Sequence, residues 1–192
     1  MPCSPVELLA RHDPSAWTRT LAYRARAELP FDATSVGGAT PVMLDTTVHL
    51  DAFKPPGLPA TIARLVARNV VLHSAIACAE LALSVRHLDP AHPRTAAHRA
   101  PLIEILSRMA PARIMAPSAD AWTEAALIAG TLARIQGYQR EGRREVLHDA
   151  LMLLTAMEAG ATLISRNVRH MDLLLRFPPD AEVLLYDRPA LV

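Results

Sequence analysis

From residue 41 onward, short apolar runs alternate with longer stretches that have helical periodicity. The apolar runs are uniformly hydrophobic in the middle, which is typical of strands buried on both faces. This alternation predicts an α/β fold, a three-layer α/β/α domain built on a central parallel sheet of four to five strands. The predicted strands are residues 42–45, 69–74, 112–117, 161–165 and 182–187, and the clearest predicted helices are 74–88, 118–137 and 144–160. The polar stretch 87–101 is expected to lead into a further helix.

The first forty residues have a different pattern and predict a helical arm followed by a linker. SPVE at residues 4–7 is a capping box with proline at the first helical position. DPSAW at 13–17 can begin a second helix that would carry Trp17 and Leu21 one turn apart. Pro30 and the run SVGGATP then end the helical pattern, so we divide the chain into an arm at 1–40 and a body at 41–192.

The arm combines apolar residues with arginines, which suits a segment that lies on another surface. Trp17, Leu21 and Leu29 recur at helical spacing, with Arg19, Arg24 and Arg26 among them. One destination is the body of the same chain or of a dimer partner, and the other is a groove that a partner protein would occupy. We favour structural docking, because tethered helices are usually held by apolar burial.

Composition excludes several classes of protein. The formal net charge is +1, so there is no bulk electrostatic case for a nucleic-acid or membrane partner, although a locally basic surface remains compatible with it. Two cysteines are too few for a disulfide framework, which favours a reducing compartment. The chain has neither an export signal nor an uncharged apolar run long enough to span a membrane, so we expect a cytoplasmic protein.

Three carboxylates and an amide should meet at the carboxyl edge of the predicted sheet, where ligands bind in such folds. Asp45 ends the first strand, and Glu80 lies within two turns of the helix that leaves the second. Asp149 lies eleven residues before the helix end at Gly160, roughly 16 Å back towards the same edge. The strand at 161–165 returns there and delivers Asn167.

Each of these residues also has a structural interpretation. Asp45 can cap the following helix, and Asn167 can cap the helix that begins at Val168. Glu80 can be a partly exposed helix acid, and Asp149 can pair with Arg143 or Arg144 across one turn. The conjunction favours function, because like charges gathered in a low-dielectric pocket raise one another's pKa unless a cation neutralises them. The pattern therefore predicts a metal site.

Carboxylate oxygens are ligands for Mg²⁺ or Mn²⁺ rather than Zn²⁺. The histidines do not form a pair one helical turn apart beside a third ligand, which also disfavours zinc. His148 and His170 lie near the acids in the predicted topology, but we do not expect either to be a primary metal ligand.

These motifs resemble those of a known family. VMLDTTVHLDAF (42–53) resembles the opening of a PIN domain, AELAL (79–83) its second motif, and LHDALMLLTAMEAGATLISRNVRHM (147–171) its third and fourth. Their order and spacing over residues 41–187 are similar to the VapC-type toxins of bacterial toxin–antitoxin pairs. The resemblance implies a dimeric endoribonuclease that depends on Mg²⁺ or Mn²⁺ and is often silenced by a small antitoxin.

Carried over residue by residue, the resemblance makes Asp45, Glu80 and Asp149 the metal ligands, with Asn167 at the fourth catalytic position. Where an aspartate often follows three residues later, this chain has His170, so Asp172 is not assigned as a ligand. RNA would be contacted by arginines that the topology puts near the same edge, for which a solvated basic rim is the alternative. These arginines are Arg143, Arg144, Arg166 and Arg169, with Arg140 beside them.

Three other protein classes are alternatives to a ribonuclease. A haloacid-dehalogenase-like phosphatase needs a second aspartate two residues after the first, where this chain has Thr47. A receiver-type phosphoacceptor needs an acidic pair and a late lysine, and the only lysine is Lys54. The strongest rival is a PIN-fold protein without turnover that binds RNA or a partner.

Overall fold

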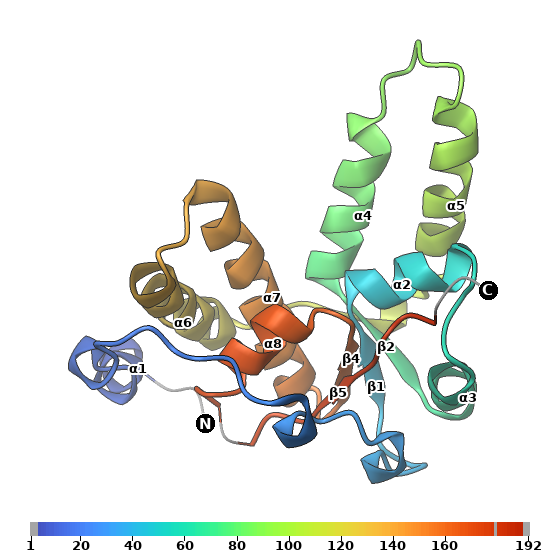
Figure 1. Ribbon diagram of the computed structural model, residues 1–192. Coiled ribbons are helices and arrows are strands. Elements are labelled where there is room, and N and C mark those ends of the chain that lie inside the picture. The colour runs from blue at the N-terminus through green and yellow to red at the C-terminus, as the bar shows by residue number, and fades with distance from the viewer. Residues whose placement is uncertain (1–3, 179, 190–192) are drawn as a thin grey trace.

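The computed structural model describes residues 4–178 and 180–189, and its centre is a sheet of five parallel strands (Figure 1). The strand order is β3-β2-β1-β4-β5, so the strand that ends before Asp45 is central. All five strands predicted from the apolar runs are present, although each is shorter than its run. The strands are β1 Val42–Leu44, β2 Val71–Ser74, β3 Ile114–Met115, β4 Thr162–Ser165 and β5 Val183–Leu185.

Helices cover both faces of this sheet, which confirms the predicted α/β/α architecture (Figure 1). Alternate strand residues enter different cores, because successive side chains of a strand point to opposite faces. Met43 packs with α6, α7 and α8, whereas its neighbours Val42 and Leu44 pack with α2 and α3. The helices are α1 Pro5–Arg11, α2 Thr46–Phe53, α3 Ala60–Arg68, α4 Ala75–His87, α5 Thr95–Ser107, α6 Ala119–Gln136, α7 Arg140–Glu158 and α8 Val168–Leu174.

Helices α4 and α5 form an antiparallel hairpin that projects beyond the sheet (Figure 1). The polar stretch 87–101 contributes the tip of this hairpin and the beginning of α5 at Thr95. A small third core, formed by Leu81, Ile105 and Met109, holds the base of the hairpin against α2. The hairpin therefore stands beside the edge at which β1, β2 and β4 end.

The first helix of the arm is present as predicted, but the prediction of a second arm helix is wrong. Ser4 and Glu7 form both hydrogen bonds of a capping box at the start of α1. Asp13 caps only a single 3₁₀ turn, Pro14–Ala16, and the chain from Trp17 to Ala25 is irregular. Trp17 and Leu21 consequently do not lie one turn apart on a helix. Two further 3₁₀ turns follow, Arg26–Glu28 and Ala33–Ser35.

The irregular part of the arm lies on the body of the same chain, where side chains of the body satisfy its backbone groups. Arg134 donates to the carbonyl of Trp17 and Gln136 to that of Leu21, while the indole of Trp17 stacks on Phe177 with ring centroids 4.4 Å apart. The carbonyl of Pro30 accepts from the backbone N–H of Leu185 in β5 at 2.7 Å. These contacts replace the hydrogen bonds that a helix would have made within itself.

Within residues 4–178 and 180–189, no helix is both long and apolar enough to cross a membrane.

Candidate active site

Asp45 stands at the carboxyl end of β1 and is 2 % exposed. Its backbone N–H donates to the carbonyl of Ile164, which fixes it opposite the end of β4. Its carboxylate accepts hydrogen bonds from the hydroxyl of Thr47 at 3.0 Å and from the hydroxyl of Ser165. It also caps α2 through the backbone N–H of Thr47 at 3.4 Å, so the capping role coexists with its position at the sheet edge.

Glu80 reaches the same edge from the second turn of α4 and is partly exposed. Its Oε2 accepts a hydrogen bond from the hydroxyl of Thr46 at 2.5 Å, and its Oε1 lies 2.7 Å from Nδ1 of His148. Thr46 follows Asp45 directly, so these two bonds tie the helix acid to both the strand end and α7.

Asp149 lies on α7, is 7 % exposed, and contacts the N-terminus of α8. Its Oδ2 accepts a hydrogen bond from Nδ2 of Asn167 at 2.8 Å and lies 2.5 Å from Nδ1 of His170. Asn167 is also the N-cap of α8, because its Oδ1 accepts from the backbone N–H of His170 at 3.4 Å. Asn167 therefore caps α8 and also contacts one of the predicted metal ligands.

The three carboxylates act on one another electrostatically. Burial raises the pKa of Asp45 to about 6, and the charge of Asp149 contributes to that rise. Burial likewise raises the pKa of Asp149, partly opposed by its hydrogen bond with His170, and the charge of Glu80 adds to the rise. This is the mutual repulsion that a bound cation would relieve.

The donor set fits Mg²⁺ or Mn²⁺ in type, since it consists of carboxylate oxygens. In the part of the chain that the structure describes, no three His, Cys, Asp or Glu side chains are already arranged as a metal cage. Each acid is turned instead towards a neighbouring hydroxyl, imidazole or amide. Metal binding would require these side chains to turn from their present partners towards the ion.

The arginines predicted to contact RNA have different hydrogen-bond partners in the structure. Arg166 donates through Nε to the buried carboxylate of Asp51 at 2.6 Å, and Tyr186 donates to the same oxygen. Arg143 donates to the carbonyl of Tyr138, while Arg169 donates to the hydroxyl of Tyr23. Arg144 remains on the surface at the start of α7, where it lines a cavity of about 310 Å³ with Arg140 and Glu141.

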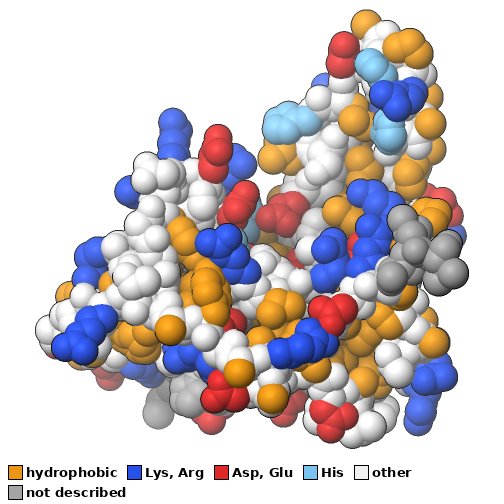
Figure 2. Space-filling model, viewed as in Figure 1, with side chains coloured by type: hydrophobic (Ala, Val, Ile, Leu, Met, Phe, Trp, Pro, Cys, Tyr) orange, Lys and Arg blue, Asp and Glu red, His pale blue; other side chains and the backbone are white. Residues whose placement is uncertain are grey.

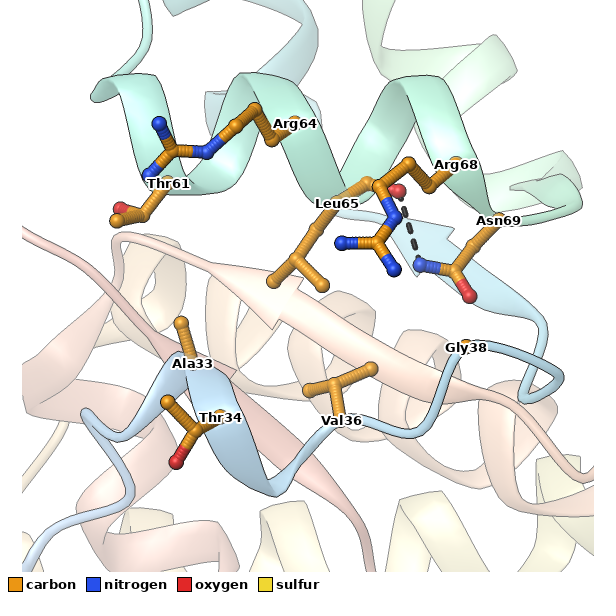
Figure 3. Close-up of a pocket in the computed structure, with 9 residues that line it drawn as sticks. All are labelled: Ala33, Thr34, Val36, Gly38, Thr61, Arg64, Leu65, Arg68 and Asn69. Atoms are coloured by element: carbon orange, nitrogen blue, oxygen red, sulfur yellow. Dashed lines mark hydrogen bonds between the residues drawn. The ribbon is translucent and has the colours of Figure 1, made fainter.

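A notch separates α7 from the α4–α5 hairpin, and Figure 2 shows acidic and basic side chains together around its floor. A separate cavity of about 300 Å³ lies between α3 and residues 33–38, as Figure 3 shows. That cavity is lined by Arg64, Arg68 and Asn69 among others and contains none of the four predicted catalytic residues. The four predicted catalytic residues therefore lie outside this cavity.

Sequence reasoning missed the hydroxyls that orient the acids. Thr46, Thr47 and Ser165 each donate to Asp45 or Glu80, and Ser165 also accepts from the backbone N–H of Asn167. Their position is a usable signal, because each lies at a predicted strand end or within two residues of it. Asp172, which we do not assign as a ligand, pairs with Arg24 of the arm at 2.6 Å.

The sequence model of the PIN domain matches residues 42–173, which is more than half of the chain. The chain belongs to the PIN domain family. PIN domains are generally nucleases, and the matched segment contains all four residues predicted to be catalytic. No curated protein matches the chain.

Three solved structures share the fold at low sequence identity. VapBC2 from Rickettsia felis, bound to a DNA fragment from its promoter, has 22% identity and a TM-score of 0.52, covering 77% of this chain and 99% of that one. FitAcB from Neisseria gonorrhoeae has 20% identity and a TM-score of 0.51, and the match covers 74% of this chain and 96% of that one. FitAB bound to an IR36 DNA fragment has 19% identity and a TM-score of 0.50, and the match covers 75% of this chain and 94% of that one. These similarities support the PIN fold.

Proposed function

We propose that this PIN domain protein is an endoribonuclease that depends on Mg²⁺ or Mn²⁺ and hydrolyses RNA phosphodiester bonds. The observation that carries the proposal is the convergence of Asp45, Glu80 and Asp149, from three different elements, at one sheet edge where each acid perturbs the next. Buried carboxylates that repel one another lower stability, so their presence together favours a functional role.

Asp45, Glu80 and Asp149 would hold the metal. When bound, a divalent ion lowers the pKa of a bound water and neutralises charge on the scissile phosphate and the leaving oxygen. Ser165 and Thr47 hold the Asp45 carboxylate in place, and Thr46 does the same for Glu80. Asn167 orients Asp149 through its amide, and His148 and His170 lie within hydrogen-bond distance of the acids.

The substrate proposal is RNA, which the PIN resemblance implies and which the basic start of α7 can accommodate. Arg140 and Arg144 face a surface hollow there, and arginines bind phosphates without reading sequence. We further propose that the protein is the toxin of a toxin–antitoxin pair and forms a homodimer. The similarity of its fold to VapBC2 and to FitAB supports the antitoxin as a partner.

The deciding experiment incubates the purified protein with a mixed RNA pool in Mg²⁺, in Mn²⁺ and in a chelator, and sequences the product ends. Attack by a metal-activated water predicts cleavage only with a divalent ion, leaving 5′-phosphate and 3′-hydroxyl ends. RNA that is bound but remains intact with both ions would favour the alternative, a PIN-fold protein that binds RNA or a partner without turnover.

Replacing Asn167 with aspartate should retain cleavage and tighten Mg²⁺ binding roughly tenfold, because ligand charge tunes the affinity of oxygen-ligand sites. The same change removes the amide donor from Asp149 and places two carboxylates together, so it should lower the melting temperature in chelator. Calorimetric titration with Mg²⁺ and thermal melts with and without the ion measure both effects.

The matched control is Asn167→Ser, because serine keeps the helix cap without adding a charge. The serine variant should not tighten Mg²⁺ binding. If the aspartate variant lost stability with no change in metal affinity, Asn167 would be only a helix cap.

A further inference from the structure

An open hollow of about 460 Å³ lies between the arm and α8, outside the cluster of acids. One wall comes from the irregular part of the arm and the other from the first turns of α8, so the PIN segment alone would not form it. The lining residues are Tyr23, Arg24, Leu29, Val168, Arg169 and Asp172.

The arm beside this hollow is hydrogen-bonded to the body at Thr20, Ala22 and Arg24. The hydroxyl of Thr20 donates to the carbonyl of Ile135 at 2.8 Å, and the carbonyl of Ala22 accepts from Arg176 at 3.1 Å. The backbone N–H of Arg24 donates to Asp172 at 2.8 Å. Tyr23 is therefore presented by a backbone that is already ordered, which reduces the entropy lost when a ligand binds.

Tyr23 has the features of a stacking residue. It is 47 % exposed although it is a large aromatic side chain, and its hydroxyl accepts from Nε of Arg169 at 2.8 Å. The guanidinium carbon of Arg169 lies 5.7 Å from the centre of the ring. An aromatic face beside a guanidinium matches one nucleotide, since bases stack on aromatic rings and phosphates bind arginine.

The hollow is connected to the acids through α8 and Tyr138. Arg169 is next to His170, whose Nδ1 lies 2.5 Å from Asp149. The ring of Tyr138 lies 5.9 Å from that of His170. Burial raises the pKa of Tyr138 to about 12, and the nearby phenol of Tyr23 adds to the rise. A strand of RNA held at the acids could thus continue directly onto Tyr23.

The charge around the hollow favours an anionic ligand over a basic peptide. Arg24 and Arg169 line it. Asp172 is buried and already paired with Arg24 and with Arg176, which lies behind the lining. Three guanidinium groups against one carboxylate leave a positive excess, which would repel a basic protein segment.

We propose that this hollow is a nucleotide subsite for the RNA substrate, in which Tyr23 stacks on one base and Arg169 contacts a neighbouring phosphate. The inference rests on the proposed ribonuclease function and extends it, because it assigns the arm a direct part in substrate binding.

The test measures binding of a labelled single-stranded oligouridylate in chelator, where no metal-dependent cleavage occurs. Tyr23→Leu should weaken binding about tenfold, in the range found for removing one base–aromatic stack. Tyr23→Phe keeps the ring and should retain most of the affinity. Trp122→Leu is the matched control, because Trp122 is equally exposed on α6 but lies outside the hollow, and it should bind as the wild type does.

A second measurement uses the same oligouridylate with single abasic positions. One abasic position should weaken wild-type binding and have little further effect on Tyr23→Leu, because the stack is already lost. Unchanged binding by Tyr23→Leu, or equal weakening by Trp122→Leu, would overturn the subsite. If Tyr23→Leu instead dissociated a dimer while RNA binding stayed constant, the hollow would be a protein contact and the proposal would be wrong.

Failure of the subsite and failure of the nuclease proposal give different results. RNA binding that depends on Tyr23, without cleavage by the wild type in Mg²⁺ or Mn²⁺, would support the subsite and contradict the nuclease. Metal-dependent cleavage with the same KM in wild type and Tyr23→Leu would support the nuclease and contradict the subsite.

Discussion

Asp45→Asn, Glu80→Gln and Asp149→Asn should each reduce RNA cleavage by at least about a hundredfold, because even residues that only orient metal ligands are worth about 10- to 100-fold. Each change removes one carboxylate oxygen donor while keeping the shape of the side chain. Initial cleavage rates at saturating Mg²⁺ measure the effect. Glu104→Gln is the control, because Glu104 lies on α5 and pairs only with Arg108 among the described residues. A variant of the three that kept the wild-type rate would show that its residue is not a metal ligand.

The same substitution at Asp45 should stabilise the metal-free protein at neutral pH. The pKa of Asp45 is raised from 3.8 to about 6 in the folded state, so the unfolded state loses its proton first as the pH rises. Stability therefore falls between about pH 4 and pH 6, and the full penalty, on the order of 3 kcal/mol, persists above pH 6. Asparagine cannot ionise, so it removes the penalty.

Thermal melts of wild type and Asp45→Asn in chelator should therefore nearly coincide at pH 4 and diverge at pH 7, with the variant melting higher. The low pKa of buried His49, about 4, acts in the opposite direction but equally in both proteins, so it cancels in the difference. Added Mg²⁺ should raise the melting temperature of the wild type at pH 7 more than that of the variant. A variant that melted lower than the wild type at pH 7 would contradict the raised pKa.

The sheet was predictable because β1, β4 and β5 are buried along their whole length and are therefore mostly apolar. Met43 and its two neighbours illustrate this, since they enter cores on opposite sides of the sheet. Convergence of the acids was also predictable, because parallel strands end at one edge and Asp149 could be located by counting back from Gly160. Its contact with Asn167 follows from that topology.

The irregular path of the arm after Ala16 was not predictable, because the helix-start signal at Asp13 and Pro14 is local and the competing contacts are distant. Asp13 and Pro14 do begin a turn, but the carbonyls of Trp17 and Leu21 find donors on α6, more than a hundred residues away. The ion pair of Arg166 with Asp51 is likewise formed across 115 residues and is invisible in either local motif. The contacts between the histidines and the acids were not predictable for the same reason. His148 reaches Glu80 only because α4 and α7 pack together.

The second large effect that we expect is a loss of fold stability when the ion pair between Arg24 of the arm and Asp172 is broken. Asp172 is 1 % exposed, and Arg24 binds it through Nε at 2.6 Å and through its backbone N–H at 2.8 Å. The remaining partner, Arg176, is 3.7 Å away. Removing Arg24 would leave the buried Asp172 with Arg176 as its one remaining charged partner among the described residues. Removing one member of a buried pair typically costs about 3 to 5 kcal/mol.

Arg24→Gln should therefore destabilise the fold by about 3 kcal/mol, lowering the melting temperature by about 6 to 12 °C in a chain of this size. The control is Arg26→Gln, because the pair between Arg26 and Asp187 is exposed on both sides and should contribute less than about 1 kcal/mol.

The double variant Arg24→Gln with Asp172→Asn removes both charges and should recover much of the lost stability, since replacing a whole buried pair is often nearly neutral. Equal melting temperatures for Arg24→Gln and Arg26→Gln would show that the arm does not hold α8 through Asp172. A large loss confined to Arg24→Gln would instead make the arm a structural part of the PIN body, because α8 carries His170 and is capped by Asn167.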